Sequence, residues 1–235
     1  MALGNKTLED LLNPLTKQLG HDQVAETVEM PEWEWKAQRV TDGKSHAQLV
    51  DMFADEAEKV RVQVRRCTKD GLPGCIAQIV GQGVPETGEE CSVVCADDDR
   101  FAQCGLYDVI GSQKLVSKVT VWDGAEGDKN VDDALVATYG LTYATAGIAE
   151  TATIVQPTSP RCGRAISLLP LAHIAVIDAS TIHPTMLEIM DDFTKEGTLP
   201  SQVCFISGPS ATADIELVRV EGVHGPMYVY YVVVE

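Results

Sequence analysis

The sequence predicts an α/β protein whose sheet is largely parallel and is covered by helices on both faces. In the second half of the chain, short apolar segments rich in β-branched residues alternate with segments of helical periodicity. Strands that are separated by helices pair in parallel, because each connection must cross over a face of the sheet. The 235 residues are 45% hydrophobic, which is enough to build one sizeable core.

The N-terminal part is predicted to be separate from this domain. Residues 1–44 are expected to form a helix followed by an extended arm. Leucines recur at helical spacing over residues 7–20, where Pro14 predicts a kink. Residues 21–44 contain two tryptophans at alternate positions, which favours an extended arm anchored by its aromatic rings. Residues 45–235 then form the α/β domain.

The α/β domain is predicted to begin with a helix that Ser45 caps and that continues to about Val60. The alternating apolar and charged residues at 60–65 predict a half-buried strand. Further helices are expected at 72–80, 131–136, 161–168 and 183–195. Further strands are expected at 91–96, 119–122, 141–145, 151–156, 173–177, 203–206 and 227–234.

The charge of the chain excludes several classes of partner. It has 35 acidic and 18 basic residues, a formal charge of −17. Nucleic acids and anionic membranes are therefore not expected as partners, because they require clustered Lys and Arg. No apolar run approaches the length of about 18 residues that a membrane span requires, and the N-terminus lacks the pattern of a signal peptide. We expect a cytoplasmic protein, in which Asp97–Asp99 forms a solvated turn or the start of a helix.

The seven cysteines are scattered, and none forms a Cys-x-x-Cys motif. An iron–sulfur cluster or a structural zinc site needs about four closely grouped ligands. We therefore expect reduced cysteines that mainly pack in the core, and no metal or other cofactor bound by this chain.

The most polar stretch of the domain is a turn that follows the strand expected at 203–206. Ser207, Gly208 and Ser210 would leave backbone N–H groups pointing at one spot, which suits an anion. Thr212 adds a hydroxyl group close by. The alternative interpretation is a tight turn that only connects two strands.

Several titratable residues are candidates for acid–base chemistry. Asp214 and Glu216 face the same side of a strand, where they either exchange protons or cap the preceding turn. His224 lies in a loop between two glycines and is the histidine best placed to titrate. Glu150 lies between small residues, where a carboxylate needs a partner, and Arg164 is the cation expected to pair with it.

The predicted sheet also suggests where these residues meet. Ligands of parallel sheets bind at the carboxyl ends of the strands. We therefore expect the turns at 207–210, at 146–150 and around His224 to lie at that edge. His173 lies in an apolar strand, which favours a core histidine with satisfied hydrogen bonds.

Four segments together resemble a known family. Residues 207–216 (SGPSATADIE) and 221–226 (EGVHGP) are similar to the C-terminal signature of the lactate-utilisation protein C family, also called the LUD-domain family. Residues 147–154 (GIAETATI) and 164–174 (RAISLLPLAHI) agree with it. The family more often has glycine at the position of Ala152. The resemblance is strongest over about the last hundred residues and continues in order over the rest.

The resemblance implies a three-layer fold similar to the NagB/RpiA/CoA-transferase-like proteins. It implies a subunit of a cytoplasmic system that oxidises L-lactate to pyruvate and binds a small carboxylate. In such systems the iron–sulfur clusters belong to partner subunits, and homo-oligomers are compatible with the resemblance.

Two other functions remain open from the sequence. One is a stand-alone enzyme that acts on a sugar phosphate or an acyl thioester, with Glu150 or the pair Asp214 and Glu216 as base or nucleophile. The other is a non-catalytic assembly subunit that docks through its N-terminal helix and tryptophan arm.

Overall fold

The computed structural model describes residues 8–22, 39–196, 200–213 and 219–235. It divides into two units, residues 1–39 and residues 40–235. In the first unit, the helix α1 (Leu8–Gln18) has Pro14 in its interior, and the helix itself was predicted. Most of the predicted arm, residues 23–38, lies outside the described residues.

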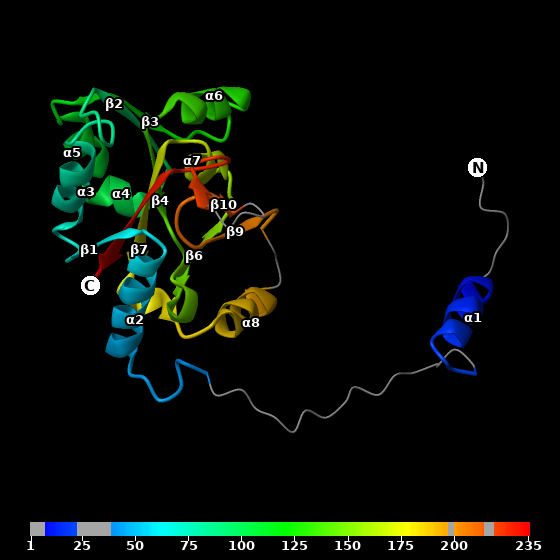
Figure 1. Cartoon of the computed structure of the whole chain (residues 1–235). Coiled ribbons are helices and arrows are strands. Elements are labelled where there is room, and N and C mark those ends of the chain that lie inside the picture. Colours follow the sequence, from blue (N-terminus) through cyan, green and yellow to red (C-terminus); the bar gives the residue numbers. More distant parts are fainter. Residues whose placement is uncertain (1–7, 23–38, 197–199, 214–218) are drawn as a thin grey trace. The chain divides into compact units, whose positions relative to one another are not determined.

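A six-stranded parallel sheet forms the centre of the second unit (Figure 1). All of its neighbouring strands pair in parallel, which confirms the predicted sheet. In spatial order the strands are β1 (Gln63–Cys67), β12 (Tyr228–Val234), β7 (Ala172–Asp178), β4 (Tyr139–Tyr143), β2 (Cys91–Cys95) and β3 (Val116–Val121).

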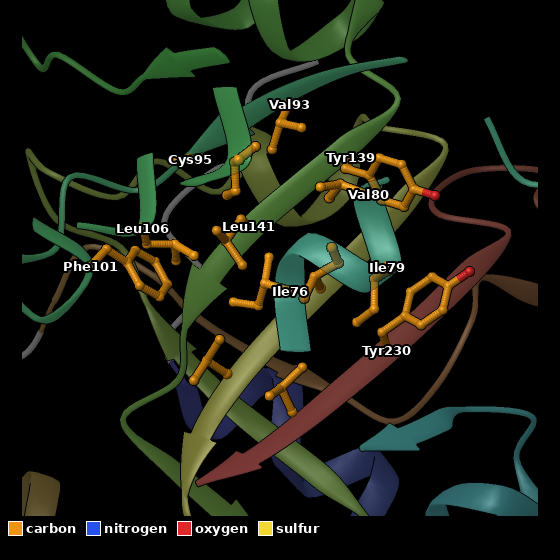
Figure 2. Packing of buried hydrophobic residues seen from close by; sticks show 14 of the residues in the cluster. Ile76, Ile79, Val80, Val93, Cys95, Phe101, Leu106, Tyr139, Leu141 and Tyr230 are labelled. Carbon is orange, nitrogen blue, oxygen red and sulfur yellow. The ribbon is translucent and has the colours of Figure 1, made fainter. Parts of the chain in front are cut away.

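Three helices cover one face of this sheet. Successive side chains of a strand point to opposite faces, so Tyr139 and Leu141 of β4 lie on the same face, and Tyr230 of β12 packs there too. Figure 2 shows Ile76 and Ile79 packed among them. The helices are α3 (Leu72–Val80), α4 (Asp99–Gln103) and α5 (Leu106–Gly111).

The opposite face is covered by helices and by a second, smaller sheet. Its first helix, α2 (His46–Lys59), begins at a capping box, in which Gln48 N–H donates to Ser45 Oγ and Ser45 N–H donates to Gln48 Oε1. Phe53 of this helix stacks on Tyr231, with ring centroids 5.4 Å apart. The other helices on this face are α6 (Asp128–Val136) and α7 (Ala165–Leu168).

The smaller sheet has four strands in mixed orientation and was not predicted. Its strand order is β8 (Ile182–His183), β5 (Ala146–Ile148), β6 (Thr153–Pro157) and β9 (Val203–Ile206). One side packs against α2 and the large sheet, and the other packs against α8 (Met186–Glu196). β10 (Ala211–Ala213) and β11 (Arg219–Glu221) form a separate antiparallel pair.

A short reversal joins β5 to β6. It consists of the 3₁₀ turn Ala149–Thr151 and of Ala152, whose φ of 48° lies in the left-handed region. A residue with a Cβ is strained there and glycine is not. Among the described residues, no helix is long and apolar enough to span a membrane.

Candidate functional site

Most residues of the predicted polar turn line a cavity of about 320 Å³ at the amino ends of β7 and β12. We call it the histidine cavity, because two histidines line it. It is formed by residues 207–210 and 224–226, together with Ser167, Leu168 and His173. Three of the segments that carry the family resemblance therefore contribute to one cavity.

The position of this cavity corrects one prediction. Ser210 N–H donates to the carbonyl oxygen of Pro226, 2.9 Å away, just before β12 begins. The turn at 207–210 and His224 thus lie at the amino edge of the large sheet. The prediction that they meet at the carboxyl edge is wrong, since residues that precede a parallel strand lie at its amino end.

The turn at 207–210 has a backbone that only glycine fits. Gly208 has a φ of 85°, and a Cβ on it would lie 2.9 Å from the carbonyl oxygen of Val60. Its N–H donates to Tyr231 Oη at 3.3 Å, and Tyr231 Oη in turn donates to Ile206 O at 2.8 Å. The turn is therefore fixed to the central strand β12.

Two of the backbone N–H groups that were predicted to bind an anion are used in hydrogen bonds within the protein. The N–H groups of Gly208 and Ser210 are both used within the protein, and Pro209 has no N–H. The backbone of residues 208–210 therefore presents no free donor to a ligand. Among the side chains of the wall, the hydroxyls of Ser207 and Ser210 and the two imidazoles can bind one.

A chain of hydroxyl groups connects the cavity to the segment at 147–154. Thr153 Oγ1 lies 2.5 Å from Ser207 Oγ and 2.7 Å from Thr151 Oγ1. Each oxygen can donate one hydrogen bond and accept others, so the three hydroxyls can orient one another. The reversal that contains Glu150 is thus linked to the cavity through Thr151 rather than through the glutamate side chain.

His173 is the buried polar group of the cavity. It is fully buried, and its Nε2 lies 2.9 Å from Thr142 Oγ1 on the neighbouring strand. Its Nδ1 has no hydrogen-bond partner among the described residues. Burial lowers the pKa of the imidazole to about 4, so the ring is neutral at neutral pH. The prediction of a satisfied core histidine is thus wrong for one of its two ring nitrogens.

A buried polar atom without a partner costs free energy, unless a ligand or a water completes it. His173 also lines the cavity, and Nδ1 is its ring nitrogen without a partner among the described residues. His173 lies in the segment at 164–174, as do Ser167 and Leu168, so the family resemblance was the one signal that pointed to these residues.

The short helix α7 packs closely against β4 because the strand has a glycine, Gly140, at the point of contact. A Cβ on Gly140 would lie 1.8 Å from the carbonyl oxygen of Ile166. Only glycine therefore lets this short helix approach the sheet closely enough to bring Ser167 and Leu168 to the wall.

One described candidate, Thr212, is not among the lining residues of the cavity. Thr212 is exposed in β10, opposite Val220. Asp214 and Glu216 lie outside the described residues. His224, in contrast, is an exposed residue that lines the cavity.

Glu150 and Arg164 do not form the predicted ion pair. Both are described, and no ion pair joins them in that part of the chain. Glu150 N–H donates to the carbonyl oxygen of Pro184 at 3.3 Å. Arg164 is exposed at the start of α7, near Cys204, where burial raises the pKa of the thiol and the guanidinium opposes the rise.

The histidine cavity is electrically neutral. Among its described lining residues there is no Asp, Glu, Lys or Arg. The seven cysteines are all unpaired, and within the described residues no three His, Cys, Asp or Glu side chains are grouped as metal ligands. The arrangement offers hydroxyls and imidazoles, which hold small polar molecules by hydrogen bonds.

Comparison with a solved structure supports the fold. A DUF162 family protein from Deinococcus radiodurans superimposes with a TM-score of 0.56 at 23% sequence identity. The alignment covers 82% of this chain and 99% of that protein. An α/β fold with this arrangement is therefore shared by the two proteins.

Comparison of sequences identifies the family. Residues 50–234 match the model of the LUD domain. The chain is 32% identical to "Lactate utilization protein C" of Oceanobacillus iheyensis, over 100% of both chains. It is 34% identical to the protein of the same name from Halalkalibacterium halodurans, over 97% of both chains. For that of Bacillus subtilis the identity is 31%, over 96% of this chain and 95% of that protein. As its residues suggested, this chain belongs to the LUD-domain family.

Proposed function

We propose that this chain is a subunit of a cytoplasmic lactate-utilisation system and that its histidine cavity binds L-lactate or the product pyruvate. The observation that carries the proposal is the buried His173, which lines a cavity formed by three of the family segments and whose Nδ1 has no partner among the described residues. The full-length similarity to proteins named for lactate utilisation supplies the substrate. The finer fold assignment, to the NagB/RpiA/CoA-transferase-like group, is part of the same proposal.

Lactate has two polar groups that suit the cavity. Its carboxylate accepts hydrogen bonds from the Ser210 hydroxyl and from the exposed ring of His224. Its 2-hydroxyl meets Nδ1 of His173. If Thr142 donates to Nε2, then Nδ1 carries the proton and donates; if Nε2 donates to Thr142, then Nδ1 accepts. In the second tautomer Nδ1 accepts the hydrogen bond of the 2-hydroxyl.

Oxidation of lactate to pyruvate releases two electrons and two protons. In our proposal this chain contributes the binding site, iron–sulfur clusters on partner subunits would accept the two electrons, and the two protons would leave to solvent. His224 is the proposed acid–base residue at the mouth of the cavity. Three further residues remain proposed as catalytic, namely Glu150, Asp214 and Glu216. Two remain proposed as binding residues, namely Arg164 and Thr212. None of the five belongs to the described wall of the histidine cavity.

The test is purification of the tagged chain from lactate-grown cells, followed by an assay of lactate oxidation with an artificial electron acceptor. We expect iron–sulfur subunits to co-purify with it. We expect the variants His173→Gln and His224→Ala to retain the partners and to lose at least about tenfold in activity, as expected when a hydrogen bond to a charged or reacting group is removed. His46→Gln is the matched control, because His46 is exposed and its ring makes a hydrogen bond with Ala179 O, outside the histidine cavity.

Three results would contradict the proposal in different ways. Turnover of a sugar phosphate or an acyl thioester by the isolated chain would indicate a stand-alone enzyme. A tight complex whose activity is unchanged in both histidine variants would indicate an assembly subunit. An isolated homo-oligomer without partners and without lactate oxidation would exclude the lactate system.

A further inference from the structure

A second cavity, of about 400 Å³, lies at the opposite, carboxyl edge of the large sheet. It is formed where β2 and β4 end, and it shares no lining residue with the histidine cavity. Three consecutive aspartates, Asp97–Asp99, line it together with Arg100, Arg161 and Gln156. We call it the aspartate cavity. The carboxyl edge is where parallel sheets bind ligands.

The guanidinium group of Arg100 already makes contacts with other side chains of the protein. Arg100 Nη2 lies 2.7 Å from Asp98 Oδ2, and Arg100 Nε donates to Asp98 Oδ1 at 2.9 Å. The guanidinium carbon lies 3.4 Å from the centre of the Tyr143 ring, and Nη1 lies 3.6 Å from Asp178. An anionic ligand would have to displace these contacts to reach the charge of Arg100.

The second arginine is occupied in the same way. Arg161 Nε donates to Asp97 Oδ2 at 2.7 Å, and Arg161 Nη2 donates to Asp99 Oδ1 at 2.6 Å. The hydrogen bonds from Arg161 lower the pKa of the Asp99 carboxyl. Burial opposes ionisation of Asp98, but the hydrogen bonds from Arg100 outweigh it and lower the pKa of that carboxyl too. Both aspartates are therefore ionised at neutral pH.

The carboxylates outnumber the guanidinium groups at this site. Three aspartates and two arginines line the cavity, which leaves an excess of one negative charge, and Asp178 adds a second carboxylate in excess 3.6 Å from Arg100 without lining the cavity. This local excess favours a cation over an anion. Charge alone does not define a site, but one buried side chain supplies the second observation.

Gln156 lines the cavity and has an unsatisfied acceptor. The residue is 6% exposed, and its Oε1 has no partner among the described residues. Its Nε2 lies 3.4 Å from Pro157 O and 3.6 Å from Cys162 Sγ, two groups that accept hydrogen bonds. The amide nitrogen must face these acceptors, so the carbonyl oxygen is the atom left without a donor. A ligand that satisfies it must carry an N–H or O–H group.

We infer that the aspartate cavity binds a small organic molecule with a primary ammonium group. The ammonium donates a hydrogen bond to Gln156 Oε1, and the surrounding aspartates balance its charge. A neutral alcohol can also donate to Gln156, but it gains nothing from the excess of carboxylates. An anion such as a carboxylate or a phosphate meets the wrong charge, even where it carries a hydroxyl group that could donate to Gln156. The site is independent of the proposed lactate function.

The experiment uses three probes of similar size on the full chain labelled with ¹⁵N. Ethanolammonium is the cation, ethylene glycol the neutral compound and glycolate the anion, each titrated into the millimolar range at physiological ionic strength. The side-chain amide signal of Gln156 is assigned by its loss in Gln156→Met. We expect a saturable shift of this signal with ethanolammonium, affinity about tenfold lower for the glycol, and no binding of glycolate.

Two variants separate a specific site from general attraction to an acidic chain. Asp99→Asn removes an exposed carboxylate of the cavity, and we expect it to weaken ethanolammonium binding several-fold. Asp55→Asn removes an exposed carboxylate of α2, far along the chain from the cavity, and we expect no change. Gln156→Met, followed through neighbouring backbone signals, is expected to weaken binding about tenfold.

The inference is overturned if both asparagine variants bind ethanolammonium alike, if glycolate binds as well as the cation, or if no probe gives a saturable shift. The last result would mean that water satisfies Gln156. If Gln156→Met does not fold, the comparison of Asp99→Asn with Asp55→Asn decides the outcome, because both replace exposed residues.

Discussion

His173 and Thr142 are joined across the neighbouring strands β7 and β4 by a hydrogen bond of 2.9 Å between Nε2 and Oγ1. This contact fixes the imidazole ring inside the sheet and leaves Nδ1 as its only unsatisfied nitrogen. A ring that is buried, oriented and incompletely hydrogen-bonded is prepared to bind a ligand, and its burial also predicts a pH dependence.

The stability of the protein should fall as the pH falls from about 6.5 to about 4. The pKa of His173 is about 4 in the folded chain and about 6.5 when unfolded, so between these values the unfolded state binds the extra proton. The shift corresponds to a loss of about 3 kcal/mol across this window. Denaturant unfolding at several pH values measures it.

In His173→Gln this contribution to the pH dependence should disappear, whereas His46→Gln should behave as the wild type, because His46 is exposed. An unchanged pH profile in His173→Gln would show that the ring is not responsible.

Removing the hydroxyl of Tyr231 should loosen the turn of the histidine cavity. In Tyr231→Phe the Gly208 N–H and the Ile206 carbonyl oxygen lose their partner, at a cost of about 1–3 kcal/mol in the free energy of unfolding. Tyr139→Phe is the control, since Tyr139 Oη donates to Gly83 O at 2.8 Å on the other face of the sheet. Both variants should lose stability, but only Tyr231→Phe should weaken ligand binding. If the two variants bind the ligand equally well, the turn at 207–210 does not contribute to ligand binding.

Gly208→Ala should destabilise the protein more than the same change at another left-handed glycine. At Gly208 the new Cβ meets the Val60 carbonyl oxygen at 2.9 Å, in addition to the strain of a φ of 85°. At Gly43, with a φ of 73°, it meets nothing within 4 Å. We expect about 1 kcal/mol at Gly43 and about 2–3 kcal/mol or more at Gly208. Thermal unfolding compares them, and equal losses would mean that the contact with Val60 relaxes without cost.

The hydroxyls of Thr153 and Ser207 should be energetically coupled. A double-mutant cycle with Thr153→Val and Ser207→Ala should give a coupling of about 0.5–1.5 kcal/mol, because the two oxygens are 2.5 Å apart and Thr153 is buried. The exposed pair Thr158 and Ser201, whose hydroxyls lie 3.1 Å apart, is the control and should give a smaller coupling. Additive effects at Thr153 and Ser207 would rule out a shared hydrogen bond in solution.

The fold was predictable where the signal is local. Ser45 and Gln48 encode the start of α2 within four residues, and alternating strands and helices encode the parallel sheet. The smaller sheet was not predictable from periodicity, because β5 has three residues and β8 has two. The reversal between β5 and β6 needs a left-handed backbone at residue 152. A glycine in the sequence would have indicated such a turn, but this chain has alanine there.

The site was predictable in part. One cavity is lined by four of the predicted residues, Ser207, Gly208, Ser210 and His224. These residues lie in the two segments, 207–216 and 221–226, that resemble the family signature. Their position at the amino edge follows from the strand at 228–234, which His224 precedes, but the general rule about carboxyl ends pointed to the other side. The unsatisfied nitrogen of His173 depends on the register between β7 and β4, which composition does not reveal.

The most direct test of the account is to titrate L-lactate into the chain with ¹⁵N-labelled histidine rings and to follow the ring nitrogens. The account predicts a saturable shift of His173 Nδ1, a smaller shift of His224, and none of His46. It also predicts that Tyr231→Phe weakens this response and Tyr139→Phe does not. A chain that binds lactate without any change at His173, or that leaves all histidine signals unchanged, would contradict the proposal that this cavity is the lactate site.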